Sequence, residues 1–321
     1  MNTSYRNPAG IDTSKANLDV HLLPAGIAKR FANTAAGHRE LIEFLKSHQV
    51  DLVVIEATGG YEHAAVVAMV CAKLGVHVAQ PQVIHAFARS LKQLAKTDPI
   101  DAYICARYAQ DRGHELLIID KIDANLEKIK ILVNRRDELV SMRTMEKNRL
   151  QQASDVDAID SLQDHLAYFD KVIERVEKRI DDTIAAAPDL NAKAKVLRTI
   201  QGVGPQTARA VIGLLPELGQ VDDKRLNALV GVAPFARESG NSKGQRHIYG
   251  GRKLLRGCLY MACLTGITRN PRISARYKHL TQTNGKDHKS AMMDCIRVLL
   301  RYMDKLVRSL TQPVPPPASA A

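Results

Sequence analysis

Long apolar runs, cysteine pairs and tryptophan are all missing from this sequence of 321 residues. No apolar stretch reaches the ~18 residues of a membrane-spanning helix, so we expect no membrane span. The five cysteines form no C-x2-C pair, which argues against a zinc site or a disulfide framework. No apolar segment of a secretory signal follows Met1 to Arg6. These absences predict a cytoplasmic protein.

Acidic residues are scarce in one part of the chain. The formal net charge is +12, and the segment from Arg237 to Arg308 holds 16 Lys and Arg against 4 acids, a difference of +12 that accounts for the whole excess. Such a basic segment indicates a polyanionic partner, most simply nucleic acid. A membrane surface suits it less, because no amphipathic anchor with bulky apolar residues accompanies the charge. With only 4% aromatic residues, phosphate contacts rather than base stacking should supply most of the affinity.

The first third of the chain has the pattern of an α/β domain. Three antiparallel strands are expected first, followed by a helix capped by Thr34 and then by alternating strands and helices. The apolar run from Leu52 to Ile55 predicts a strand buried on both faces, and this strand ends at Glu56. This order is that of ribonuclease-H-like folds, in which the first strand lies beside the fourth. The predicted strands are residues 10–15, 18–23, 27–32, 52–56 and 76–79.

Four acidic residues stand where such a fold would bring them together. Asp12 and Glu56 end two neighbouring strands, and Asp98 and Asp101 lie on one face of a helix start. Converging carboxylates cannot all stay ionised without cations, and oxygen-only ligands favour Mg²⁺ or Mn²⁺. Two such ions could stabilise the oxygens of a phosphoryl transfer. A simpler interpretation stays open, in which Asp98 caps the helix before Pro99 and Asp12 is a turn residue.

The middle of the chain has the periodicity of a coiled coil. Between Glu127 and Ala185, apolar residues recur at spacings of three and four and are flanked by charge. A break at residues 154–157 would let two helices fold back as a hairpin or pair with a second chain. Periodicity does not distinguish these arrangements. The most regular part of the seam is Ile159, Leu162, Leu166, Phe169, Ile173, Val176 and Ile180.

A helix-hairpin-helix pattern follows Pro188. Gly202 and Gly204 would allow a tight turn, and the next helix, which includes Thr207, would present free backbone N–H groups to a phosphate. Such hairpins hold the DNA backbone without reading its sequence. The alternative is a plain helix–helix turn, although the apolar frame around the glycines favours the hairpin.

A serine-containing segment precedes the richest group of cations. Ser239 and Ser242 lie among Gly and Asn residues that predict an exposed loop, where serine is usually a turn residue. A serine there could instead attack a phosphate, with nearby cations stabilising the developing charge. The candidate nucleic-acid-binding cations are Lys243, Arg246, Arg252, Lys253 and Arg256.

Taken in order, these blocks resemble insertion-sequence transposases of the IS110 family, the DEDD serine recombinases. The matching motifs cover nearly the whole chain: Gly10-Ile11-Asp12, Ile55 to Gly59, Lys96 to Ala102, Gly202 to Pro205 and Pro234 to Gly240. The resemblance implies a metal-binding tetrad at Asp12, Glu56, Asp98 and Asp101. It also implies that the nucleophile is Ser239 rather than Ser242, because the family's serine directly precedes a glycine.

The resemblance implies a domain order as well. A RuvC-like catalytic domain would occupy residues 1–118, a coiled coil 119–187, and a mostly helical transposase domain 188–312, before a disordered tail at 313–321. The implied partners are donor and target double-stranded DNA, an element-encoded bridge RNA as guide, and further copies of the chain as a dimer or a dimer of dimers, in the bacterial cytoplasm.

Two other functions stay open at this point. In the first, the tetrad activates water and the protein is a structure-specific, Holliday-junction-resolvase-like nuclease without a covalent intermediate. In the second, the hairpin and the basic segment bind DNA without catalysis, which four well-placed acids disfavour. A covalent protein–DNA adduct would distinguish the recombinase from the nuclease.

Overall fold

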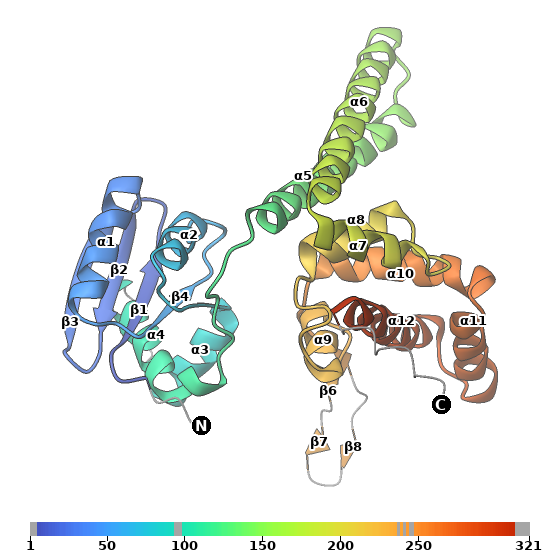
Figure 1. Cartoon of the computed structure of the whole chain (residues 1–321). Helices are drawn as coiled ribbons and strands as arrows, with labels where there is room; N and C mark the ends of the chain where they lie inside the picture. The colour runs from blue at the N-terminus through green and yellow to red at the C-terminus, as the bar shows by residue number, and fades with distance from the viewer. Residues whose placement is uncertain (1–4, 93–97, 236–237, 240–241, 244–246, 312–321) are drawn as a thin grey trace, which may run out of the picture. The chain divides into compact units, whose positions relative to one another are not determined.

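The computed structural model describes residues 5–92, 98–235, 238–239, 242–243 and 247–311 (Figure 1). The chain forms two compact units, one up to Asp123 and one from Ala124 onward, and each is considered separately. Arg246, the first two residues of the Lys96 to Ala102 motif and the tail expected to be disordered lie outside the described residues.

The first unit is built on a mixed five-stranded sheet with the order β3-β2-β1-β4-β5. β1 is antiparallel to β2 and parallel to β4, which confirms that the first strand lies beside the fourth. β5 continues the sheet parallel to β4, and β3 forms the other edge. The strands are β1 (Pro8–Thr13), β2 (Asn17–Leu22), β3 (Ile27–Ala32), β4 (Leu52–Glu56) and β5 (Val76–Ala79).

Helices cover both faces of this sheet (Figure 1). α1 (Ala35–Ser47) and α2 (His63–Cys71) bury one face in an apolar cluster that includes Ile11 and Ile55. α3 (Pro81–Ser90) and α4 (Asp98–Arg112), with the short 3-10 helix η1 (Gly113–Glu115), lie on the other face. The expected cap of α1 is confirmed, since Gly37 N–H donates to Thr34 Oγ1 at 3.2 Å.

Gly10 lets α4 lie directly on β1. A Cβ atom at this position would come within 2.1 Å of both the Ala102 carbonyl oxygen and the Ala106 amide nitrogen. Any larger residue would therefore push the helix away from the strand. This close approach brings the first turn of α4 to the end of β1.

The second unit is almost entirely helical. Its helices are α5 (Ala124–Leu150), α6 (Val156–Ala186), α7 (Pro188–Arg198), α8 (Pro205–Leu214), α9 (Asp223–Val230), α10 (Lys253–Arg269), α11 (Pro271–Lys278), the π-helical turn η2 (His279–Thr283) and α12 (His288–Thr311). Between α9 and α10 lie four two-residue strands, β6 (Pro234–Phe235), β7 (Glu238–Ser239), β8 (Ser242–Lys243) and β9 (His247–Ile248).

α5 and α6 fold back on each other as a helical hairpin (Figure 1). The predicted break lies between Leu150 and Val156, and Asp155 caps α6 by accepting from Ala158 N–H at 3.0 Å. At its base the hairpin shares the apolar core of α7 to α12, through Ile129 and Ile180 among others. The hairpin is thus part of the second unit. Within the described residues, no helix has both the length and the apolar character needed to cross a membrane.

Candidate active site

The ends of β1 and β4 carry the first two candidate acids. Because the strands are parallel and Ile11 lies opposite Ile55, Asp12 and Glu56 follow at the same edge of the sheet. Side chains alternate along a strand, so Asp12 is on the same face as Gly10, which α4 covers. The first turn of α4 contributes Asp98 and Asp101 to this edge.

Electrostatic effects on two neighbouring groups show that the four acids converge. Burial, followed by the carboxylates of Asp101, Glu56 and Asp98, raises the pKa of Asp12 to about 6 against an opposing backbone hydrogen bond. The Cys105 thiol, buried beneath the site, has its pKa raised by burial and then by Glu56, Asp12 and Asp101. The acids that sequence reasoning placed on three separate segments thus influence one another electrostatically.

A fifth acid and an arginine belong to this edge and were missed by sequence reasoning. Asp19 of β2 lies directly opposite Asp12 and is buried. Arg30 of β3 places its Nε 2.8 Å from Asp19 Oδ1 and its Nη2 3.4 Å from Asp98 Oδ2, so it bridges two acids. The sequence could have revealed Asp19 through the expected pairing of the first two strands, because this register sets Asp12 and Asp19 side by side.

Hydrogen bonds hold the two loops that follow the strand-end acids. Asn33 donates from Nδ2 to the carbonyl oxygens of Ser14 and Tyr61, at 3.0 Å each. Ser14 lies two residues after Asp12, and Tyr61 lies in the loop that begins after Glu56. Asn33 Oδ1 is in turn 2.7 Å from Nε2 of the buried His38. Asn33 therefore ties together the chain segments that present the two acids.

The donor set at this edge consists of oxygens, which suits Mg²⁺ or Mn²⁺. Burial is the main cause of the raised pKa of Asp12, and the repulsion between carboxylates that adds to it is the part that a cation would relieve. In the part of the chain that the structure describes, no three His, Cys, Asp or Glu side chains already form a close ligand group. The donor atoms suit a divalent ion in their chemistry, and the four acids lie toward one edge of the sheet without forming a ligand group.

The glycine turn of the second unit separates α7 from α8. Gly202 has a φ of +98°, and a Cβ atom there would come within 2.8 Å of the Ala262 carbonyl oxygen, so the turn packs on α10. Gly204 is exposed and precedes the first residue of α8, whereas Thr207 is only 7% exposed. The accessible polar group of this turn is its backbone and not the Thr207 hydroxyl.

The serine segment contains two short ribbons where a loop was expected. β6 pairs with β9, and β7 pairs with β8 in a register that sets Ser239 directly opposite Ser242. The two candidate nucleophiles are therefore cross-strand neighbours. Gly240-Asn241 between them is a sequence typical of a two-residue hairpin turn, which was the signal for this pairing.

Two of the candidate cations have partners inside the second unit. Arg252 forms a two-pronged ion pair with Glu217, at 2.7 and 2.5 Å, and also donates to the Leu214 carbonyl oxygen. Arg256 donates to the carbonyl oxygens of Val230, Gly231 and Gly250, which lie on the two chain segments that lead into and out of the ribbons. Lys253, the first residue of α10, is exposed.

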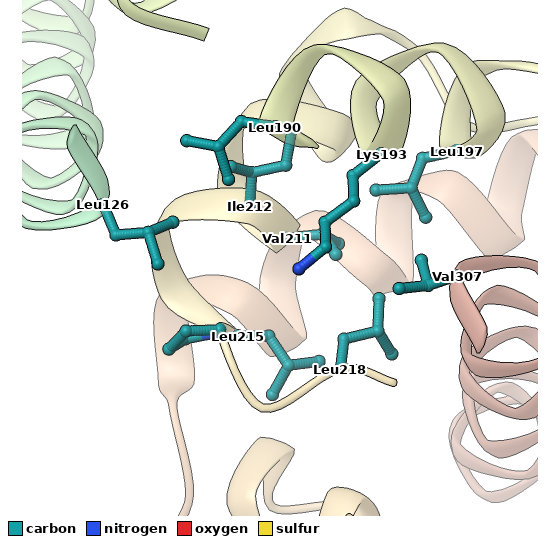
Figure 2. A pocket seen from close by; sticks show the side chains of 10 residues that line it. Leu126, Leu190, Lys193, Leu197, Val211, Ile212, Leu215, Leu218 and Val307 are labelled. Carbon is teal, nitrogen blue, oxygen red and sulfur yellow. The ribbon is translucent and has the colours of Figure 1, made fainter. Parts of the chain in front are cut away.

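A narrow apolar pocket lies elsewhere in the second unit, between α7, α8 and α12 (Figure 2). Leucine, valine and isoleucine side chains line it, and the amine of Lys193 points into it. Its free volume is about that of one water molecule. None of the candidate site residues lines this pocket, so it is not the place of the chemistry.

Comparison with known proteins bears on both units. A family model described as a transposase, of the DEDD IS110 type, matches residues 9–155. A second model, described as the transposase IS116/IS110/IS902 family, matches residues 194–278. The pilin gene-inverting proteins of Moraxella lacunata and Moraxella bovis are each 27% identical to this chain over 309 residues, which are 93% of this chain and 95% of each relative.

The first match includes all four acids at the sheet edge, and the second includes the glycine turn and the serine segment. Models of the same transposase family therefore match parts of both units, and the matched parts include the candidate catalytic residues. A DEDD-type domain is consistent with the use of a divalent metal. The chain belongs to the IS110 family of transposases and is an enzyme of DNA strand transfer.

Proposed function

We propose that this transposase cuts and rejoins donor and target DNA strands with a metal-binding acidic tetrad and a serine nucleophile. The tetrad comprises Asp12, Glu56, Asp98 and Asp101, and the nucleophile is Ser239. The observation that carries the proposal is the convergence of the four carboxylates beside the first turn of α4. This convergence concentrates negative charge that only a cation would neutralise fully.

The first unit acts in this proposal as a RuvC-like domain. Its strand order, with helices on both faces, supports that assignment. A bound Mg²⁺ or Mn²⁺ would stabilise the charge that develops on the phosphoryl oxygens. Asp12, Glu56, Asp98 and Asp101 would hold it, and Arg30 would orient Asp98. Asn33 would keep the two strand-end acids in place through the loops that follow them.

Ser239 supplies the covalent step. Its Oγ forms a bond to the scissile phosphorus, and the bond from phosphorus to one deoxyribose oxygen breaks. The serine proton is given up, and the leaving sugar oxygen gains one. The resulting phosphoserine ester lets the strand be rejoined to a new partner without an external energy source. A water molecule in place of Ser239 would give only cleavage.

The second unit binds nucleic acid in this proposal. The exposed backbone at Gly204, before the N-terminus of α8, would contact phosphate as a helix-hairpin-helix does. Lys243, Arg246 and Lys253 would add charge, while Arg252 and Arg256 support the serine segment from within. The resemblance to the family adds a bridge RNA as guide. It also adds assembly of two or four copies that share sites between subunits.

Trapping of a covalent adduct tests this proposal. The wild-type chain, Ser239→Ala, Ser242→Ala and Asp101→Ala are incubated with Mg²⁺ and guided donor DNA, and adducts are resolved on denaturing gels. We expect an adduct with the wild type and Ser242→Ala and none with Ser239→Ala. Asp101→Ala should bind DNA as the wild type does but form no adduct, since it lacks a ligand.

Three results would contradict the proposal in different ways. An adduct that persists in Ser239→Ala but disappears in Ser242→Ala would make Ser242 the nucleophile. Cleavage without any adduct, in wild type and variants alike, would favour the hydrolytic nuclease. Wild-type cleavage rates in Asp101→Ala at limiting Mg²⁺ would remove this residue from the tetrad.

A further inference from the structure

The ribbon formed by β6 and β9 displays aromatic rings to solvent. Phe235 is 50% exposed and Tyr249, the residue after β9, is 66% exposed. His247 is exposed as well. The whole chain has only 4% aromatic residues, so rings left in water on one short ribbon are unexpected for packing reasons alone.

The pairing register indicates which rings share a face. Phe235 lies directly opposite His247, and directly opposed residues of an antiparallel pair point to the same face. Tyr249 lies just beyond the end of β9, two residues after His247, and adds a third exposed ring to this end of the ribbon. We call Phe235, His247 and Tyr249 the ring face of the ribbon.

The base of the ribbon is held firmly. The Arg256 guanidinium donates to carbonyl oxygens on both supporting segments, at 3.3, 3.2 and 2.7 Å. Gly231 and Gly251 lie so close that a Cβ atom on Gly251 would come within 2.2 Å of the Gly231 amide nitrogen. The ring face is thus anchored to the end of α9 and the start of α10. The serine segment lies between the same two helices.

The chain segment that carries the ring face is rich in cations, although Arg252 and Arg256 are paired within the second unit. From Ser239 to Lys286 the sequence contains ten Lys and Arg residues and no Asp or Glu. A polyanion with flat apolar groups would satisfy both the rings and the charge, and a DNA strand with unpaired bases has that composition. A duplex would satisfy only the charge, because its bases are stacked on one another. A protein partner would need a large acidic surface.

We propose that the ring face stacks on unpaired bases of the DNA strand beside the scissile phosphate. This inference rests on the proposed function and adds to it a preference for locally opened DNA. Strand exchange requires nucleotides to leave one duplex before they enter another, and rings next to Ser239 would hold them during that interval. Phosphate contacts still supply most of the total affinity.

Binding without cleavage tests this inference. The full chain, free of divalent metal, is titrated into a fluorescein-labelled single-stranded DNA and into the matching duplex, with anisotropy as the readout. Phe235→Leu and Tyr249→Leu each remove a ring and keep apolar bulk. Tyr168→Leu on α6, which removes a ring that is 62% exposed, is the matched control.

We expect each ring-face variant to bind the single strand about fivefold more weakly or worse and the duplex within twofold of wild type. The loss should persist across a salt series, because stacking releases no counterions. Tyr168→Leu should match the wild type. Unchanged melting temperatures would show that the variants fold, as expected for exposed side chains.

The inference would be overturned by equal losses on single strand and duplex, or by no loss on the single strand. A change in sedimentation with no change in DNA binding would instead assign the ring face to contacts between copies. The adduct assay is independent of these results. Wild type that forms no adduct but loses single-strand affinity in the variants would contradict the serine mechanism and support the ring face.

Discussion

The pKa of the Asp12 carboxyl group is raised both by burial and by neighbouring negative charges. Burial comes first and neighbouring carboxylates second in raising its pKa to about 6, from an ordinary value of 3.8. A raised pKa means that the fold favours the protonated form. The stability linked to this group is therefore fully present below the unfolded-state pKa and is lost as the pH rises through 6.

Asp12→Asn tests this linkage, because Asn mimics the neutral acid. In metal-free protein, we expect the melting temperature of Asp12→Asn relative to wild type to rise between pH 4 and pH 6 and to level off above pH 6. Adding Mg²⁺ at pH 7.5 should stabilise the wild type and leave the variant unchanged, which reverses the order. Asp160→Asn, at an exposed position on α6, is the control and should show no pH-dependent difference. If the melting temperatures of Asp12→Asn and wild type differed by the same amount at every pH, the raised pKa of Asp12 would be contradicted.

Among the elements, the α5–α6 hairpin depends on α8 for its attachment. Arg209 of α8 is 9% exposed and contacts two acids of α6. Its Nε and Nη2 lie 2.8 and 2.5 Å from the two carboxylate oxygens of Asp181, and its Nη1 lies 2.9 Å from Glu177. These contacts join the base of the hairpin to the helix that follows the glycine turn.

We expect Arg209→Met to destabilise the second unit by about 1 kcal/mol, since it keeps the apolar stem but removes a largely buried guanidinium from Asp181, which is exposed, and from Glu177, which keeps its ion pair with Arg136. Urea unfolding followed by circular dichroism measures the loss. Arg143→Met is the matched control, because Arg143 pairs across the same hairpin with the exposed Asp170 at 2.6 Å. That change should cost about 0.5 kcal/mol or less. Similar losses in both variants would show that Arg209 does not anchor the hairpin.

Elements that a capping residue or an apolar run marks in the sequence were predicted closely, whereas elements without such a mark were not. Thr34 was expected to cap α1, and β5 was expected at residues 76–79; both are confirmed. The four two-residue strands between α9 and α10 were expected to be loop. A strand of two residues is too short for an alternating pattern, and β6 finds its partner β9 across more than ten residues of chain.

For the molecule as a whole, the segregation of charge has a measurable consequence. Each phosphate contact on duplex DNA contributes about −0.9 to the slope of log affinity against log salt, so about six contacts would give a slope near −5. We expect full-length protein to show a slope of this order. Lys253→Gln should weaken binding and reduce the slope by about 0.9. Lys171→Gln, at an exposed position on α6, should leave both unchanged. A flat salt series would mean that the basic segment is not the nucleic-acid surface.

The charge excess, the helix starts, the apolar periods and the family's motifs could all be recognised along the sequence, because each depends on residues close together in the chain. The position of Asp19 opposite Asp12, the bridge from Arg30 to Asp98 and the inward use of Arg252 and Arg256 could not be. A cation looks the same in sequence whether it faces a phosphate, a carboxylate or a backbone carbonyl. Its partner is chosen by burial, because an unpaired polar group removed from water is costly and takes whichever acceptor the fold brings near. The tetrad and Ser239 stay predictions for the same reason, since metal ligation and nucleophilic attack depend on side chains that meet only when ion and DNA are bound.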